Sequence, residues 1–256
     1  MKAINSYPLI ISDFSKTTIN YKKICNKRGS LLLNMCFSIK VFIDGNGVKR
    51  CKTLKSNKID YRLFIGILLA AGLMYVTFEY ASVFWYLYGA SMLFLISWVI
   101  LNDELKKRYS VLKNIIPGIF SGIILYILFY IGALLLKFIP GNFDALVAKG
   151  YNKYEPESLL IWLLLVVAIV PGEEIFWRGF VLKRLENDLV PWVAVLIMAA
   201  LNGALMLFSG NFVIALAAAL ASVFWGFMYV RRPSLSLVII SHWTFNLLLL
   251  LILPIY

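Results

Sequence analysis

Seven long apolar stretches follow one another along most of the chain, and they limit what it can fold into. They run approximately over residues 62–81, 82–101, 115–137, 158–176, 190–208, 211–230 and 235–255. A helix needs roughly 20 apolar residues to cross the hydrocarbon core of a bilayer, and each stretch is about that long. The hydrophobic content of 61% and the mean hydropathy of +0.83 are too high for a soluble globular domain. The sequence therefore predicts an all-α helix bundle with about seven transmembrane helices, a multi-pass protein of the cell membrane.

The basic residues are distributed unequally between the segments that connect these stretches. Of the 25 Lys and Arg residues, 21 fall on the side that contains the N-terminus, and only Lys137, Lys149 and Lys153 fall on the other, while Arg178 lies at the end of the fourth stretch. Cytoplasmic loops of membrane proteins carry such an excess. We therefore predict that the N-terminus is in the cytoplasm and the C-terminus outside. The net charge of +12 follows mostly from this topology, and it favours membrane lipids over nucleic acid as partners.

Residues 1–60 differ in composition from the rest of the chain, because they are basic and polar. Their one apolar run, 31–43, is too short to cross a bilayer and is interrupted by Lys40. The segment does not have the form of a secretory signal peptide. We interpret it as a basic cytoplasmic or interfacial extension, with a small hairpin around residues 44–47, and we interpret 61–256 as the membrane-embedded domain.

Few strongly polar side chains lie inside the seven stretches, and apart from Glu79, at the junction of the first two, they lie in the last four. They are Glu173, Glu174, Arg178, Asn202, His242 and Asn246. Such groups are costly in a membrane and usually face a bundle interior or a polar cavity, so they are candidates for function. Residues four apart share one face of a helix, which pairs Glu174 with Arg178 and His242 with Asn246.

The depth of these groups in the membrane is compatible with a common site. His242 is expected about 12 Å from the cytoplasmic end of its helix, at a rise of about 1.5 Å per residue. Glu173 is expected about 10 Å from the same side, if the fourth helix continues to about Phe180. The two side chains can then meet.

A structural alternative exists for the same residues. Pro171 and Gly172 can break the fourth stretch, in which case Glu173 and Glu174 are first-turn acids of a short cytoplasmic helix, stabilised by its dipole. Under this interpretation, the later His and Asn only form hydrogen bonds between helices.

Two motifs resemble those of a known family. E-E-x-x-x-R runs from Glu173 to Arg178, and H-x-x-x-N follows two stretches later, from His242 to Asn246. Together they are similar to the CPBP family of intramembrane CAAX-processing endopeptidases and bacteriocin-processing or immunity proteins, also called Abi proteins. The resemblance implies that residues 61–256 form a membrane-embedded protease domain, with its core motifs in 158–256.

The resemblance also implies a role for each motif residue. Glu173 corresponds to the general base that activates a water, and Glu174 and Arg178 correspond to the pair that supports the site. His242 and Asn246 correspond to the residues that stabilise the negative charge developing on the substrate carbonyl oxygen, either as metal ligands or as an oxyanion hole. A divalent metal such as zinc is one cofactor that the resemblance allows, with Glu173 and His242 as ligands.

One element of the family pattern is missing from this chain. Where the family has F-x-x-x-H, Asn202 stands at the Phe position and Met206 at the His position, and His242 is the only histidine of the protein. A catalytic zinc usually has three protein ligands, so the missing His counts against a zinc enzyme. A metal-free, glutamate-dependent protease is less affected.

Three functions remain open on the sequence alone. The first is an intramembrane endopeptidase, metallo- or glutamate-dependent, that cleaves a lipidated or transmembrane peptide. The second is a catalytically impaired pseudo-protease that acts as a membrane binding or immunity protein. The third is a small transporter, but the chain shows no internal repeat and its polar groups are concentrated in the last four stretches, which favours a single asymmetric site.

Overall fold

The computed structural model of the chain describes residues 39–40, 43–44, 47–48, 52–53, 60–103 and 111–255. The chain divides into two units, Met1–Leu54 and Lys55–Tyr256. In the first unit, short strands pair antiparallel, β1 (Ile39–Lys40) with β4 (Lys52–Thr53) and β2 (Ile43–Asp44) with β3 (Gly47–Val48). Asp44 lies opposite Gly47, in agreement with the predicted hairpin. The interpretation of residues 1–60 as a basic extension stays a prediction.

Seven helices in the described part of the chain are long and apolar enough to cross a membrane, so the predicted all-α, multi-pass bundle is confirmed. The spans are Tyr61–Glu79 (α2), Ala81–Asn102 (η1, Ala81–Val83, and α3, Phe84–Asn102), Leu112–Leu136 (α4), Leu159–Asp188, Pro191–Ser209 (α9, Pro191–Met206, and η4, Leu207–Ser209), Phe212–Arg231 (α10) and Leu235–Ile252 (α11, Leu235–Leu247, and η5, Leu248–Ile252). A shorter helix, α5 (Phe143–Tyr154), precedes the fourth span. The orientation of the termini stays a prediction.

The fourth span is longer than predicted, because it continues past residue 176 to Asp188, and Pro171 and Gly172 do not break it. It is one helix in five parts: α6 (Leu159–Leu164), the π-helical η2 (Leu165–Ile169), α7 (Val170–Glu174), the π-helical η3 (Ile175–Leu182) and α8 (Lys183–Asp188). Proline removes a backbone donor and crowds the carbonyl four residues earlier, and the widened turn of η2 lies where that crowding occurs. The alternative in which Pro171 and Gly172 break this span is therefore wrong.

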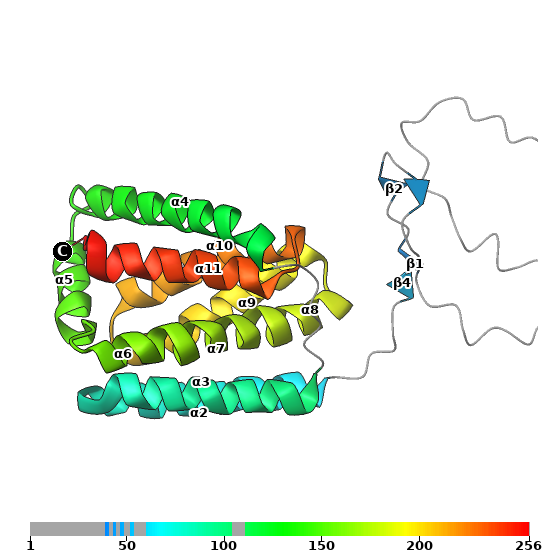
Figure 1. Ribbon diagram of the computed structural model, residues 1–256, viewed down its shortest axis with the longest axis horizontal. Helices are drawn as coiled ribbons and strands as arrows, with labels where there is room; N and C mark the ends of the chain where they lie inside the picture. The colour runs from blue at the N-terminus through cyan, green and yellow to red at the C-terminus, as the bar shows by residue number, and fades with distance from the viewer. Residues whose placement is uncertain are drawn as a thin grey trace, which may run out of the picture. The chain divides into compact units, whose positions relative to one another are not determined.

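The fourth span lies in the middle of the bundle. Figure 1 shows α2 and α3 together along one side of it, and α11 beside α4 along the other. The fourth span also contacts α9 and α10. A residue on this helix can therefore reach side chains from most of the other spans.

Glycines allow two of these contacts to be close. A Cβ added at Gly172 would lie 2.6 Å from the Met92 Cβ, so α7 packs directly on α3. A Cβ added at Gly122 would lie 2.5 Å from the Ser241 carbonyl oxygen, so α4 packs directly on α11. Small residues at helix crossings are typical of membrane bundles, because they let backbones approach.

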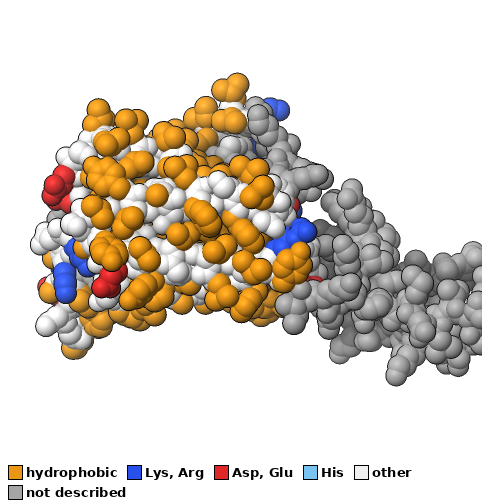
Figure 2. Space-filling view, turned by 90° about the horizontal axis from the view of Figure 1, so that it is seen from below, with side chains coloured by type: hydrophobic (Ala, Val, Ile, Leu, Met, Phe, Trp, Pro, Cys, Tyr) orange, Lys and Arg blue, Asp and Glu red, His pale blue; other side chains and the backbone are white. Residues whose placement is uncertain are grey.

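The surface of the bundle is that of a membrane protein. Large apolar side chains such as Phe64, Leu68 and Phe120 are more than half exposed. Figure 2 shows hydrophobic side chains along the length of the bundle, with charged side chains toward its ends. In water such a surface would be unfavourable, whereas the hydrocarbon core of a bilayer solvates it.

A cluster of ion pairs connects α2, α3 and α8 at one end of the bundle. Arg184 of α8 forms an ion pair with Asp60, the residue that caps α2, and donates to the Asn102 carbonyl oxygen at 2.9 Å. Arg184 and Lys183 both pair with Asp103, which follows α3, at 3.5 and 2.5 Å. This end is the one that we predict to face the cytoplasm.

Candidate active site

The two acids and the arginine of the fourth span lie at the centre of the bundle. Glu174 and Arg178 are 0% and 1% exposed, and the Arg178 Nη1 donates to the Glu174 Oε1 at 3.2 Å. The Arg178 Nη2 also donates to the Ser222 carbonyl oxygen of α10, at 3.4 Å. The guanidinium lies over the Trp225 ring, 5.5 Å from its centroid. A charge pair so deeply buried requires these further partners, because burial removes its solvation by water.

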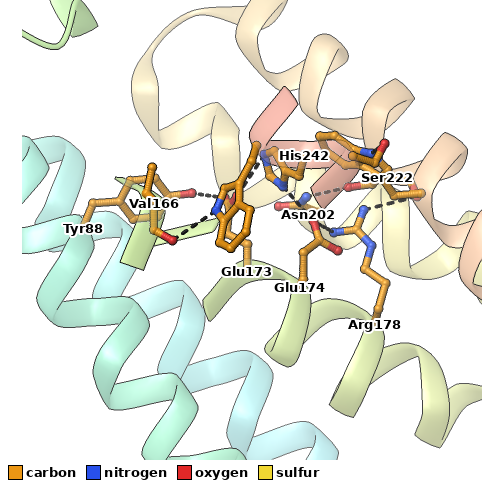
Figure 3. A network of polar contacts seen from close by, with 11 residues as sticks. Tyr88, Val166, Glu173, Glu174, Arg178, Asn202, Ser222 and His242 are labelled. Carbon is orange, nitrogen blue, oxygen red and sulfur yellow. Dashed lines mark hydrogen bonds and ion pairs between the residues drawn. The ribbon is translucent and has the colours of Figure 1, made fainter. Parts of the chain in front are cut away.

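His242 of α11 meets both acids, as the predicted depths require. Its Nδ1 lies 2.7 Å from the Glu174 Oε1, and its Nε2 lies 3.6 Å from the Glu173 Oε2. The imidazole stacks on the Trp225 ring with centroids 3.9 Å apart. The Trp225 indole in turn donates to the Ser241 Oγ at 3.1 Å. The histidine ring is therefore fixed on two sides and points toward both carboxylates (Figure 3).

The geometry also fixes the direction of one proton. Glu174 is paired with Arg178, and an ionised carboxylate only accepts hydrogen bonds, so we assign a proton to the Nδ1 of His242 from its short contact with the Glu174 Oε1. The Nε2 then faces Glu173. A histidine oriented by one carboxylate and presented to another is a common arrangement in sites that move protons.

Asn246 lies one turn beyond His242 on α11 and is half-buried. Within the part of the chain that the structure describes, no hydrogen bond joins its amide to the two acids. The structure thus brings together Glu173, Glu174, Arg178 and His242, whereas Asn246 forms no hydrogen bond to this cluster among the residues that the structure describes.

The two residues at the F-x-x-x-H position do face the site. Asn202 and Met206 of α9 line a cavity of about 10 Å³, together with Tyr88 of α3. A cavity of this size holds about one water. The Asn202 Nδ2 donates to the Ser222 Oγ at 2.6 Å, so the amide connects to the backbone that holds Arg178.

Several polar atoms of this cluster are buried without a hydrogen-bond partner among the described residues. They are Glu174 Oε2, Arg178 Nε and Asn202 Oδ1. Unpaired buried polar atoms cost stability, and a purely structural cluster would pair them. Their accumulation here favours a site that binds water or substrate over one that only holds helices together.

Tyr88 is the site residue that the sequence reasoning missed. Its hydroxyl donates to the Glu173 Oε1, across 85 positions of the chain. The available signal was periodicity, since Phe84, Tyr88, Met92 and Leu95 are buried at helical spacing on α3. That pattern places Tyr88 on the core face of its span, unlike the tyrosines that lie at the membrane surface.

The residues present do not fit a catalytic zinc. Among the described residues, no group of three or more His, Cys, Asp or Glu side chains could hold a metal ion. The Glu174 Oε1 already accepts from both Arg178 and His242. A metal bound by Glu173 and His242 alone would have one protein ligand fewer than catalytic zinc usually has. We therefore derive no step through a metal.

The bundle and this cluster define a multi-pass membrane protein with a polar site buried between its helices. A comparison with protein families agrees with this: residues 155–248 match the family model described as Type II CAAX prenyl endopeptidase Rce1-like. The resemblance to the CPBP family is thus confirmed over this segment, which contains both motifs. At the level of the family, this supports a membrane endopeptidase. No curated protein and no solved structure matches the chain.

Proposed function

We propose that the protein is an intramembrane endopeptidase in which Glu173 is the general base. The observation that carries this proposal is the convergence of Glu173, Glu174, Arg178 and His242, from two separate spans, in a buried polar cluster. A carboxylate with a fixed histidine beside it, in a site of low dielectric, suits the activation of a water molecule.

The proposed reaction is hydrolysis of a peptide bond. Glu173 takes a proton from water, and the water oxygen bonds to the scissile carbonyl carbon while the carbonyl electron pair moves onto its oxygen. The Nε2 of His242, when the ring carries its second proton, and the side-chain amide of Asn246 stabilise that oxyanion. The carbon–nitrogen bond then breaks, and the proton held by Glu173 passes to the leaving amine. Glu174 and Arg178 do not touch the substrate, and their role is to hold His242 in place.

The surroundings of the site favour a substrate with an apolar part. A groove of about 230 Å³ lies between the fourth span and α11, the two helices that carry the acids and the histidine. It is lined by Trp162, Leu165, Val166, Ile240, Trp243, Thr244 and Leu247. The Trp243 indole donates to the Val166 carbonyl oxygen at 3.0 Å, so the groove wall joins both helices. We propose a lipidated or transmembrane peptide as the substrate, in line with the CAAX prenyl endopeptidases that the family model describes.

A second function is favoured by one observation, the methionine at position 206. It is buried beside the site where the family motif has a histidine. A thioether neither donates nor accepts strongly, so it supplies no acid–base group. A pseudo-protease that binds a membrane partner or confers immunity is therefore the alternative proposal. The cavity beside the cluster has room for about one water, so it gives little support to the transporter hypothesis.

Cleavage by the purified protein in detergent separates the two proposals. The substrates are prenylated and unprenylated peptides of the same sequence, and the variants are the wild type and Met206→His. Cleavage by the wild type, faster for the prenylated peptide, is the expected result. Cleavage by the Met206→His variant alone would support the pseudo-protease.

A further inference from the structure

A side chain from outside the two motifs holds the proposed base. Tyr88 is 7% exposed, and its hydroxyl donates to the Glu173 Oε1. It belongs to α3, which lies outside the segment 155–248 that matches the family model. The contact is therefore a property of this chain that its motifs do not contain.

Tyr88 and His242 approach Glu173 at different oxygens. The tyrosine hydroxyl contacts Oε1, and the His242 Nε2 faces Oε2 at 3.6 Å. In Figure 3 Tyr88 reaches the cluster from the side opposite Arg178. The hydrogen bond at one oxygen and the packing of His242 against the other restrict the carboxylate to one orientation, and a base needs such an orientation toward its water.

The packing of α3 explains why the hydroxyl reaches the acid. Gly172 precedes Glu173 and has no room for a Cβ, because the Met92 Cβ would be 2.6 Å away. Met92 lies one turn from Tyr88 on the same buried face of α3. The close approach of the two helices at Gly172 therefore sets the distance that the phenol has to span.

Tyr88 also shares its cavity with the two residues that replace the family motif. Asn202 and Met206 line the same space of about 10 Å³. The Asn202 Nδ2 is engaged by Ser222, whereas its Oδ1 is buried without a partner among the described residues. This space thus has on its wall one phenol oxygen, whose proton goes to Glu173, and one amide oxygen, and it has room for about one water that donates to them.

We infer that Tyr88 is the positioning residue of Glu173, and that together with Asn202 it supplies the polar contacts that a histidine at position 206 would supply. This inference rests on the proposed function of Glu173 as the base. Tyr88 orients the carboxylate through its hydroxyl, and the Asn202 carbonyl accepts from a water in the cavity. Met206 fills the remaining volume without a polar role.

The test uses the full-length protein with Tyr88→Phe, which removes only the hydroxyl. We expect kcat for the cleaved peptide to fall by about 10- to 100-fold with KM little changed, as for other partners that orient a reacting group. The matched control is Tyr126→Phe, since the Tyr126 hydroxyl is also in a span but donates to the Leu253 carbonyl oxygen at 2.7 Å rather than to a residue of the site. Its kcat should equal that of the wild type.

Rescue distinguishes positioning from a structural effect. Met206→His places a ring nitrogen in the same cavity, so it should restore much of the kcat in the Tyr88→Phe background and change it little in the wild-type background. Two results would overturn the inference. One is a kcat of Tyr88→Phe equal to that of the wild type, and the other is a loss of kcat that is the same for Tyr88→Phe alone and for Tyr88→Phe combined with Met206→His.

A second readout does not depend on cleavage. The infrared band of the Glu173 carboxyl group is assigned by its loss in Glu173→Gln, and it should shift in Tyr88→Phe but not in Tyr126→Phe. An unchanged band would contradict the hydrogen bond and the inference with it. If the wild type cleaves no peptide but the band shifts, the proposed function fails while the contact between Tyr88 and Glu173 stands.

Discussion

At the scale of single residues, the site is a chain of contacts that starts at a buried arginine. Arg178 pairs with Glu174, Glu174 accepts from His242, and the histidine faces Glu173. Each of these groups would be costly alone between membrane helices, so each depends on the next. The arrangement explains why the motif contains two adjacent acids: one holds the histidine, and the other is free to react.

This dependence predicts an unequal effect of two charge removals. Arg178→Met leaves the fully buried Glu174 without its cation, and we expect a loss of about 3 to 5 kcal/mol in the free energy of unfolding. Lys183→Met removes a partner of Asp103 that is 46% exposed, and the loss should be below about 1 kcal/mol. Unfolding in detergent with a denaturant titration measures both. Equal losses would contradict the assignment of Arg178 as the support of the cluster.

At the scale of helices, the sequence predicted the elements better than their contacts. Six spans agree with the predicted stretches to within three residues, because each is a long apolar run with polar ends. The fourth was predicted too short, since its apolar run ends shortly before Arg178, whereas the helix continues to Asp188. The π-helical turns around Pro171 and Gly172 leave no pattern in the sequence. Spacing within a helix paired Glu174 with Arg178, but it contains no information on Tyr88, which reaches Glu173 from another helix.

The close crossing of α4 and α11 predicts different effects of alanine at two glycines. A Cβ at Gly122 would lie 2.5 Å from the Ser241 carbonyl oxygen and 2.7 Å from the Thr244 Cβ, whereas nothing lies within 4 Å of one at Gly132. We expect Gly122→Ala to lower the free energy of unfolding by about 1 to 3 kcal/mol. Gly132→Ala on the same helix should be neutral or slightly stabilising. Similar stability of the two variants, measured by thermal unfolding in detergent, would rule out this crossing.

At the scale of the whole molecule, the bundle surrounds its polar cluster with helices and exposes apolar side chains to lipid (Figure 2). The cluster of Asp60, Asp103 and Arg184 joins three helices at the end that we predict to be cytoplasmic. An endopeptidase built in this way would receive a substrate that is itself held at the membrane.

The predicted orientation is tested by labelling. In a background in which Cys25, Cys36 and Cys51 are replaced by Ser, single cysteines are introduced by Asn152→Cys in α5 and Asn187→Cys in α8, both at exposed positions. A membrane-impermeant maleimide added to intact cells should label the first variant and not the second. The reverse pattern would place the N-terminus outside.

The most direct test of the account is the cleavage rate of Glu173→Gln, compared with Glu79→Gln and with the wild type. Glu79 is an exposed acid at the end of α2, so its variant controls for the loss of a carboxylate as such. If Glu173 is the base, Glu173→Gln should unfold at about the same Tm as the control and show no measurable cleavage. Glu79→Gln should cleave like the wild type. A folded Glu173→Gln protein that cleaves at the wild-type rate would contradict the central claim.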